Sequence, residues 1–219
     1  MKRLRLAVFS ILLVLLMAGS SFAAQRACPQ TTSDWQECER SVETQLIKEF
    51  PRLFERDGPK LVLRYANSRE ELFADGELEK DHESSYRGYV LIGYYSSIGY
   101  SVLRRWFYES STVDLVNMRT GNHTDIAGVP ALSPSGTRLA VGWFEELVGR
   151  GSFAVYRINA DDVTREFYEE MEGREVMDLR WFGDTSLSFV DSNFEPPIKK
   201  SKVLKGRLGA NKTLVWKVE

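Results

Sequence analysis

Hydrophobic and polar residues alternate in short stretches from Leu53 to the C-terminus, with turn signals between them. Such alternation is typical of strands that bury one face. In Lys60–Tyr65, for example, it places Leu61 and Leu63 on the same side. The pattern predicts strands at Lys60–Tyr65, Glu70–Phe73, Tyr86–Tyr95, Tyr100–Tyr108, Thr112–Asn117, Ala131–Ser133, Arg138–Phe144, Phe153–Asn159, Thr164–Tyr168, Val176–Trp181, Ser186–Asp191, Lys202–Leu208 and Thr213–Val218. Short strands at this spacing indicate a mainly β fold, either a sandwich, a barrel or a propeller.

One segment, residues 33–49, has the helical period instead. Ser33 or Asp34 can cap its N-terminus, and Pro51 ends it. Three apolar residues of the segment, and Phe50 directly after it, fall on one face; the three are Val42, Leu46 and Ile47. This face predicts a helix that packs on a sheet. An acidic and polar stretch farther on, Asp75–Ser85, predicts an exposed loop.

The first 23 residues have the layout of a secretory signal peptide. Three cations at positions 2, 3 and 5 precede an apolar run, Leu6–Ala18, and small residues follow. The run is shorter than the roughly 20 residues that span a bilayer. We expect cleavage after Ala23, or alternatively after Ala24, with an uncleaved anchor as the other interpretation. The prediction is a chain exported to the periplasm of a Gram-negative bacterium, or secreted, with no stable membrane insertion after cleavage.

Two cysteines, Cys28 and Cys38, lie just inside the expected mature N-terminus. An even cysteine count in an exported chain predicts a disulfide, with two free thiols as the alternative. Their spacing lacks the C-x-x-C geometry of redox motifs. The bond would tie the N-terminus to the predicted helix. The chain thus divides into a signal peptide (1–23), an N-terminal segment with a capping helix (24–52) and a β domain (53–219).

The charge of the chain argues against nucleic acid as a partner. The full sequence has 29 Lys and Arg against 31 Asp and Glu, a net charge of −2. Removing the leader takes away three cations and no acids, which leaves a mature net charge of −5. Proteins that bind nucleic acid usually carry a basic stripe instead.

A weak internal repeat favours one of the β architectures. Leu139–Phe144 is similar to Val90–Tyr95, 49 positions earlier, and Leu132–Gly136 is similar to Leu179–Gly183, 47 positions later. A period near 47 residues falls in the range of propeller blades.

The sequence Val129–Trp143 resembles the blade signature of WD-repeat and periplasmic Tol-type β-propellers. In those blades an apolar residue precedes Ser-Pro-Asp-Gly and an apolar strand follows; here Ser135 stands where Asp is usual. Asp178–Phe189 resembles the start of a next blade, and Val113–Thr120 is similar to the outer strand that ends one. The resemblance implies propeller-like sheets and names no activity.

The length of the β domain departs from a complete propeller. At about 47 residues per blade, residues 53–219 hold three to four blades, whereas a closed ring usually has at least four. Either the first blade is compressed into residues 53–85 or the ring is open. An open array exposes sheet edges that need a cap, and the helix at 33–49 is a natural one. The predicted fold is a small or incomplete propeller-like array of antiparallel sheets with one N-terminal helix.

Motifs for catalysis are sparse. The two histidines, His82 in the polar loop and His123 in a turn, are 41 residues apart and lack metal-ligand spacing. Ser152 follows a glycine but is not in a G-x-S-x-G elbow. Adjacent acids such as Asp161 and Asp162 are common; this pair predicts a hairpin turn. The sequence therefore predicts no catalytic residues, no metal site and no cofactor.

Aromatic residues are the most distinctive feature. They crowd the hairpin around Tyr94 and recur as adjacent pairs in later strands. Neighbouring residues of a strand face opposite sides, so one of each pair is expected in the core and the other outward. Outward aromatics near arginine mark binding surfaces, and packed core is the alternative. The predicted binding residues are Tyr94, Tyr95, Arg104, Trp106, Trp143, Phe144, Arg180 and Trp181.

These features together predict an exported binding protein without catalytic activity. Its partner would be another envelope or secreted protein, which it binds or inhibits. The alternative is a hydrolase of glycans or peptidoglycan that uses Asp and Glu residues. A structural or lipid-facing envelope protein is a third interpretation.

Overall fold

The computed structural model describes residues 28, 35–76, 86–108, 110–145, 149–193, 199–208 and 214–219. The predicted signal peptide and its cleavage site lie outside these residues, as do Ser33, Asp34, His82 and most of the predicted polar loop. Within the described residues the chain folds into one helix and fifteen strands, which confirms a mainly β fold with a single helix.

The strands form four antiparallel sheets, and in each sheet the strands lie side by side in chain order. Sheet I contains β1 (Phe54–Asp57), β2 (Lys60–Arg64) and β3 (Glu70–Ala74). Sheet II contains β4 (Gly88–Tyr95), β5 (Tyr100–Trp106), β6 (Ser111–Asn117) and β7 (His123–Ile126). Sheet III contains β8 (Ala131–Leu132), β9 (Arg138–Glu145), β10 (Arg150–Ile158) and β11 (Val163–Glu172). Sheet IV contains β12 (Arg174–Trp181), β13 (Ser186–Asn193), β14 (Lys199–Leu208) and β15 (Leu214–Val218).

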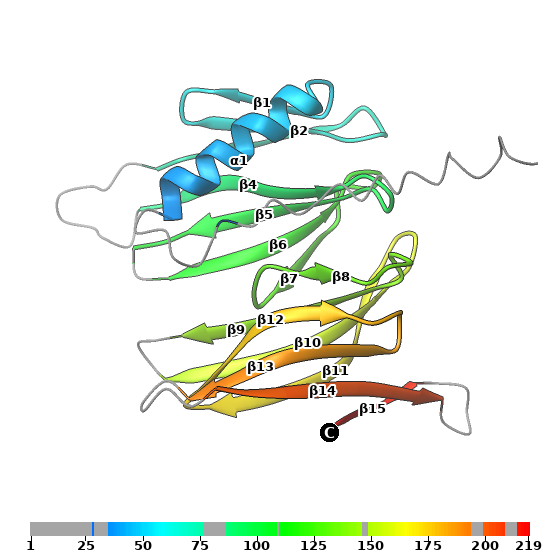
Figure 1. The fold of residues 1–219 in the computed structure, drawn as a ribbon. Helices are drawn as coiled ribbons and strands as arrows, with labels where there is room; N and C mark the ends of the chain where they lie inside the picture. The colour runs from blue at the N-terminus through cyan, green and yellow to red at the C-terminus, as the bar shows by residue number, and fades with distance from the viewer. Residues whose placement is uncertain are drawn as a thin grey trace, which may run out of the picture.

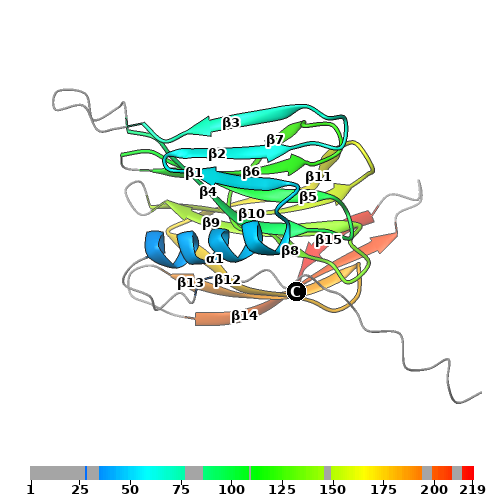
Figure 2. The ribbon, with the colours of Figure 1, turned by 90° about the horizontal axis from the view of Figure 1, so that it is seen from above.

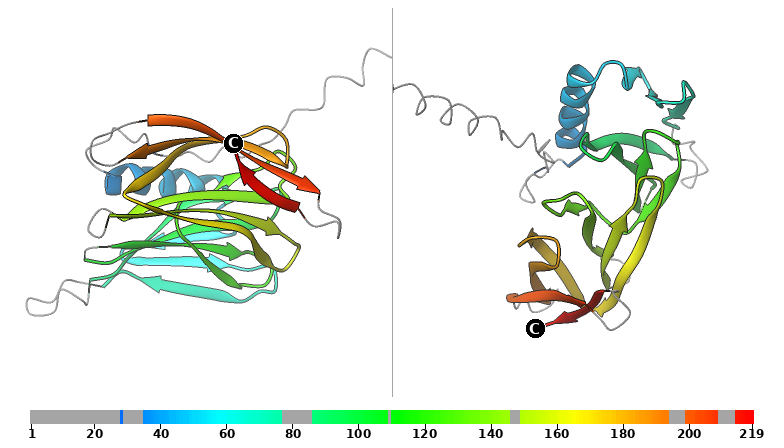
Figure 3. Two further views of the ribbon diagram at one scale, coloured as in Figure 1. Left: turned by 90° about the horizontal axis from the view of Figure 1, so that it is seen from below. Right: turned by 90° about the vertical axis from the view of Figure 1, so that its right-hand side faces the viewer.

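The four sheets follow one another through the molecule, from sheet I at the top of Figure 1 to sheet IV at the bottom. Seen from the side, they lie along an arc that is open on one side (Figure 3, right). The helix α1 (Trp35–Glu49) and sheet IV lie toward that open side.

Three apolar cores hold neighbouring sheets together. Sheets I and II enclose Phe54, Leu61, Leu63, Phe73, Leu91, Leu103 and Val116. Sheets II and III enclose Val90, Ile92, Tyr95, Tyr100, Val102, Val113, Leu115, Leu139, Val141, Ala154 and Tyr156. Sheets III and IV enclose Ala140, Phe153, Val155, Met171, Val176, Leu187, Phe189, Leu204 and Trp216. Sheets II and III are therefore covered on both faces, and their strands lack a strict alternation of buried and exposed residues.

Most predicted strands are confirmed with small shifts at their ends, and Leu61 and Leu63 both lie in the core as predicted. Two short strands differ from the prediction. β1 begins at Phe54, in a segment for which no separate strand was predicted, and pairs with β2 from Phe54 to Asp57. His123 lies at the start of β7 and not in a turn, because residues His123–Ile126 pair with β6.

The structure supports only one of the two internal sequence similarities as a structural repeat. Leu132–Gly136 and Leu179–Gly183 each include the end of the first strand of a sheet, III or IV, and the turn after it, so they occupy equivalent places. Val90–Tyr95 lies in β4, the first strand of its sheet, whereas Leu139–Phe144 lies in β9, the second strand. The second similarity therefore does not reflect equivalent positions.

The helix packs as its apolar face predicts. Val42 is buried, and Leu46, Ile47 and Phe50 pack against the core between sheets I and II. Cys28 and Cys38 form the predicted disulfide, with their Cα atoms 5.9 Å apart. The bond joins residue 28 to the first turns of α1.

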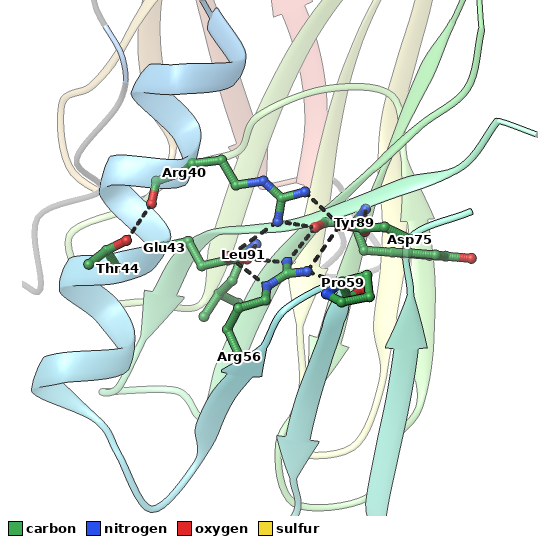
Figure 4. Close-up of polar contacts among 8 residues, drawn as sticks. All are labelled: Arg40, Glu43, Thr44, Arg56, Pro59, Asp75, Tyr89 and Leu91. Atoms are coloured by element: carbon green, nitrogen blue, oxygen red, sulfur yellow. Dashed lines mark hydrogen bonds and ion pairs between the residues drawn. The ribbon is translucent and has the colours of Figure 1, made fainter. Parts of the chain in front are cut away.

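The helix lies along the free edge of β4, which pairs with β5 alone. The Leu91 N–H donates to Glu43 Oε2 at 2.8 Å, and the Tyr89 N–H donates to Asp75 Oδ1 at 2.7 Å. Arg40 and Arg56 both donate to the Tyr89 carbonyl, at 3.0 and 2.6 Å (Figure 4). Side chains thus satisfy three backbone groups that a neighbouring strand would otherwise bond.

These capping side chains also bind one another. Glu43 is 3% exposed and accepts from Arg56 through both oxygens, at 3.0 and 2.8 Å. Arg56 and Arg40 both contact Asp75 Oδ2, at 3.2 and 2.7 Å (Figure 4). The buried carboxylate is therefore paired and hydrogen-bonded, as a buried charge must be. The cluster joins α1, β1, the end of sheet I and β4.

Candidate functional site

A cleft of about 760 Å³ is lined by α1 and by residues of sheets II, III and IV. Its walls come from α1, the end of β5, the segment before β8, the end of β9, and β12. Both α1 and β12 line the cleft, and the view from above shows α1 lying roughly parallel to the strands of the sheets (Figure 2). The lining residues are Trp35, Glu39, Arg104, Trp106, Gly128, Val129, Pro130, Ala131, Gly142, Trp143, Phe144, Glu175, Val176, Met177, Asp178 and Leu179.

Four of the eight predicted binding residues line this cleft, and they come from two sheets. Arg104 and Trp106 lie at the end of β5, and Trp143 and Phe144 lie near the end of β9. All four side chains are partly buried. The two pairs are about 40 positions apart in the sequence. The packing of sheet II on sheet III brings them to one site.

The other four predicted residues lie elsewhere. Tyr94 packs between Phe50 and Phe54 in the core, with ring centroids 4.8 and 5.4 Å away. Arg180 is exposed and does not line the cleft. Tyr95 and Trp181 lie behind the cleft wall.

Tyr95 and Trp181 support the wall from outside the cleft. The Tyr95 hydroxyl donates to the Pro130 carbonyl at 2.5 Å, and the Trp181 indole N–H donates to the Ala131 carbonyl at 2.9 Å. Both acceptors line the cleft, Pro130 directly before β8 and Ala131 as its first residue. These two aromatics therefore position the wall and are not among the lining residues that the structure describes.

The helix supplies two lining residues that the sequence did not predict, Trp35 and Glu39. They are four positions apart, so they lie on the same face of α1. Trp35 is 38% exposed, whereas Glu39 is only 4% exposed. The apolar pattern of the helix gives no sign of a buried acid. Only the position of Glu39 on the face that also carries Val42 could have suggested it.

Glu39 is held by an arginine from sheet II. Arg104 Nε donates to Glu39 Oε1 at 2.8 Å, and Arg104 Nη1 donates to Ser111 Oγ at 3.1 Å. The guanidinium also lies 5.2 Å from the centre of the Trp106 ring, a cation–π geometry. Burial raises the pKa of Glu39, and the attraction of Arg104 offsets only part of that effect.

The second oxygen of the Glu39 carboxylate, Oε2, is buried and has no hydrogen-bond partner. The Trp106 indole lowers the Glu39 pKa but completes no hydrogen bond to this oxygen. A buried acceptor without a donor is unusual in a native structure and calls for an explanation.

The floor of the cleft depends on two glycines. A Cβ at Gly142 would lie 2.6 Å from the Val176 carbonyl oxygen, and a Cβ at Gly128 would lie 2.5 Å from the Gly142 carbonyl oxygen. Both distances are too short for any side chain. The glycines therefore let the segment before β8, β9 and β12 approach closely at this point.

On the far wall, β12 is irregular where it faces the cleft. Its pairing with β13 shifts register between Met177 and Arg180, and Asp178 has a φ of 52°. A positive φ is uncommon for a residue other than glycine. The irregularity lies at the segment that brings Glu175 and Asp178 to the cleft.

No protein-family model and no curated protein matches the chain. Within the residues that the structure describes, no helix is long and apolar enough to cross a membrane. The same residues include no group of three or more His, Cys, Asp or Glu side chains placed to hold a metal ion.

The remaining candidates from the sequence lie away from the cleft. Ser152 is buried in β10. Asp161 and Asp162 lie between β10 and β11, where the Asn159 N–H donates to the Asp162 carbonyl at 2.8 Å. This contact confirms the predicted hairpin turn.

His123 bridges sheets I and II. Its Nδ1 lies 3.4 Å from Asp114 Oδ2, its Nε2 lies 3.2 Å from Glu71 Oε2, and its ring packs on Phe73 with centroids 5.9 Å apart. Tyr65 also donates to Glu71, at 2.6 Å. The hydrogen bond to Asp114 and the contact with Glu71 raise the pKa of His123, and burial only partly opposes them.

We expect this bridge to make stability depend on pH. The folded-state pKa of His123 is raised above its ordinary value of 6.5, so the protonated ring stabilises the fold fully below about pH 6.5. That contribution is lost as the pH rises through the folded-state pKa. Urea unfolding between pH 5 and 8 should therefore show a decline in stability with rising pH that His123→Gln reduces. An unchanged pH profile in the variant would contradict the assignment.

Proposed function

We propose that the chain is an exported binding protein without catalytic activity, and that its cleft receives part of a partner protein. The observation that carries the proposal is the convergence of Trp35, Trp106, Trp143 and Phe144 on one cleft, from a helix and two sheets. Tryptophan and arginine are enriched among the residues that dominate binding energy at protein interfaces. The cleft volume of about 760 Å³ falls in the range of ligand sites in proteins.

The proposal includes an open, propeller-like arrangement of the four sheets. Each of sheets II to IV is a four-stranded antiparallel meander in chain order, and sheet I has three strands, which is consistent with a compressed first blade. The arc in Figure 3 has an open side. The cleft then corresponds to the inner side of the array, where propellers commonly have their channel.

The proposal also places the protein in the periplasm, or outside the cell. The disulfide between Cys28 and Cys38 supports this placement, because disulfides persist in oxidising compartments. The predicted leader is the second argument. Fractionation of the native host should recover a chain that begins at residue 24 or 25 in the osmotic-shock fraction.

The test of partner binding is site-specific photo-crosslinking. A photoreactive phenylalanine analogue is introduced in place of Trp143, and in a control in place of Tyr168, which is 44% exposed on β11 and does not line the cleft. We expect one protein adduct in envelope extract of the native host from position 143 and none from position 168. The adduct should be identified by mass spectrometry and the complex rebuilt from purified components. No adduct, or the same adducts from both positions, would contradict the proposal.

A hydrolase that acts on glycans is the second candidate, and one observation favours it. Glu39 is a buried carboxyl with a raised pKa in an aromatic cleft, as a general acid for glycoside hydrolysis requires. The purified protein should then cleave a peptidoglycan or glycan panel, and Glu39→Gln should abolish the turnover. Absence of turnover by the wild-type protein excludes this candidate.

A further inference from the structure

Positive charge is concentrated in the last part of sheet IV. Residues 199–217, which comprise β14, most of β15 and the chain between them, include seven Lys or Arg and no Asp or Glu. The full chain, in contrast, has a net charge of −2. Lys202 Nζ lies 2.5 Å from the buried Asp191, so this lysine is bound within the sheet. The basic hairpin therefore differs in sign from the rest of the chain, which is acidic overall.

The strand register places lysines of this hairpin on the outer face of sheet IV, the face turned away from sheet III. Sheet IV is the last sheet in the row (Figure 1). Leu187 and Leu204 pair with each other and lie in the core with sheet III. Their neighbours Ser186 and Lys205 also pair and therefore point to the opposite face. Lys205 pairs in turn with Lys217, and both lysines are exposed.

Two exposed apolar side chains lie at one end of this sheet. Phe182 is 63% exposed and Val215 is 60% exposed, the highest values among the large apolar residues that the structure describes. Phe182 directly follows Trp181, and Val215 directly precedes Trp216. The rings of these two tryptophans pack on the core side of the sheet, with centroids 6.2 Å apart. Phe182 and Val215 therefore follow the alternation to the outer face.

Arg180 belongs to the same face. It is one of the residues that the sequence predicts to bind a partner, and it does not line the cleft. Arg180 is exposed and pairs with Ser188, which lies between two core residues of β13. We define the outer patch as Arg180, Phe182, Lys205, Val215 and Lys217.

Two acids close to the outer patch in the sequence or the sheet are already engaged. Asp184, in the turn after Phe182, accepts from the Ser135 N–H at 3.1 Å and is thus turned toward sheet III. Glu219 Oε2 lies 2.6 Å from Lys205 Nζ, yet the Lys205 side chain is still 47% exposed. The cations of the patch therefore remain accessible to an anionic surface.

The combination of side chains favours a lipid surface over a protein. Lysine is depleted in the buried centres of protein interfaces, whereas lysine and arginine near an anionic bilayer are attracted to its surface. Exposed aromatic and aliphatic side chains enter the boundary between headgroups and acyl chains, and long basic side chains reach the phosphates beside them. The outer patch contains both kinds of side chain on one face.

We propose that the outer patch docks the protein on a bilayer that contains anionic phospholipids. Phe182 and Val215 enter the headgroup region, and the three cations of the patch bind lipid phosphates. This docking is peripheral and reversible. None of the patch residues is among the described lining residues of the cleft, so the inference goes beyond the proposed function and does not depend on it.

The test measures co-sedimentation of the oxidised mature chain with vesicles. One set contains phosphatidylcholine alone, and the other contains phosphatidylcholine mixed with an equal amount of phosphatidylglycerol. We expect the anionic vesicles to bind at least about tenfold more tightly, with a preference that shrinks as salt is added. Equal affinity for the two sets overturns the inference. Displacement by inorganic phosphate that exceeds the effect of chloride at the same ionic strength indicates a site for the free ion and also overturns it.

Charge variants locate the docking surface. Arg180→Gln/Lys217→Gln should weaken binding to the anionic vesicles by about 30-fold, because each cation near such a surface adds to the attraction. Arg52→Gln/Lys60→Gln removes two exposed cations in and next to sheet I and should leave the affinity unchanged. Equal affinities of the two double variants contradict the location.

A second pair of variants tests the apolar contact. Phe182→Ser should weaken binding to the anionic vesicles by about tenfold, because an apolar side chain no longer enters the bilayer. Leu72→Ser is the matched control, since Leu72 is 56% exposed on β3 of sheet I. All these positions are exposed, and circular dichroism should confirm that every variant keeps the fold. A Phe182→Ser variant that binds like the wild-type chain overturns the assigned role of Phe182.

Photo-crosslinking separates this inference from the proposed function. With the photoreactive phenylalanine analogue in place of Phe182, we expect adducts with phospholipid in envelope extract of the native host. A single protein adduct from position 182 shows that the patch docks a protein and overturns the inference, while the proposed function stands on the result from position 143. Lipid adducts from position 182 without a partner adduct from position 143 contradict only the proposed function.

Discussion

Replacing Glu43 by alanine is expected to lower the free energy of unfolding by about 3–5 kcal/mol. The substitution removes the carboxylate that binds the Arg56 guanidinium through both oxygens and leaves only the contact with Asp75 to balance this side chain, which is 15% exposed. It also leaves the Leu91 N–H on the edge of β4 without an acceptor. Breaking a buried ion pair by removing one partner costs more than the pair contributes, because the other charge stays buried. Urea unfolding followed by circular dichroism measures the loss.

Two further variants give the controls for this prediction. Glu43→Gln keeps an acceptor for the Leu91 N–H but removes the charge, so it should lose less stability than the alanine variant. Glu49→Ala replaces an exposed acid at the end of the same helix and should change stability by no more than about 0.5 kcal/mol. A loss below about 1 kcal/mol in Glu43→Ala would show that the cluster does not anchor α1.

The second large effect concerns the disulfide. Cys28→Ser/Cys38→Ser is expected to lower the free energy of unfolding by about 3 kcal/mol, the loop-closure entropy of a short cross-link. The two cysteines are 10 positions apart, and the bond joins Cys28 to Cys38 in α1. Unfolding of the wild-type chain in oxidising and in reducing buffer measures the effect.

The double serine variant controls for effects of the reducing buffer that do not involve the disulfide. Its unfolding curve should be the same in both buffers and should match that of the reduced wild-type chain. The prediction is wrong if oxidised and reduced wild-type chains unfold at the same denaturant concentration.

The strands of the β domain are predictable from sequence because most of them bury at least one apolar face in a core between sheets. β7 was not predicted, since its four residues are polar except for Ile126 and follow a glycine turn. It forms because β6 supplies a partner for its backbone, from Val113 to Val116. Pairing of this kind depends on tertiary structure and leaves little trace in the local pattern.

The buried acids of α1 show a different limit of the sequence. Glu39 and Glu43 look like solvent-facing helix residues in the linear pattern, yet both are almost fully buried. Their partners are arginines 65 and 13 positions away, Arg104 and Arg56. A charged side chain can be buried only where the fold brings a partner near it. The local sequence around Glu39 or Glu43 therefore does not predict that the residue is buried.

The candidate site was predictable in part for a similar reason. Arg104, Trp106, Trp143 and Phe144 were found because aromatic clusters at strand ends are visible in sequence. The expectation that one residue of each aromatic pair faces outward is wrong for Tyr94 and Tyr95. Tyr94 packs toward sheet I and Tyr95 lies in the core toward sheet III. Tyr95 is buried and Tyr94 is partly buried, because another sheet packs on each face of sheet II.

The position of the helix along β4 also affects self-association of the protein. A bare strand edge is a template on which another chain can add a strand, the first step toward fibres and swapped dimers. On β4 the backbone groups of Tyr89 and Leu91 are occupied by carboxylate and guanidinium groups, which cannot pass a hydrogen-bond ladder onward. An incoming strand would have to separate Glu43 from Arg56 first. The same contacts that stabilise the fold therefore protect it from aggregation at this edge.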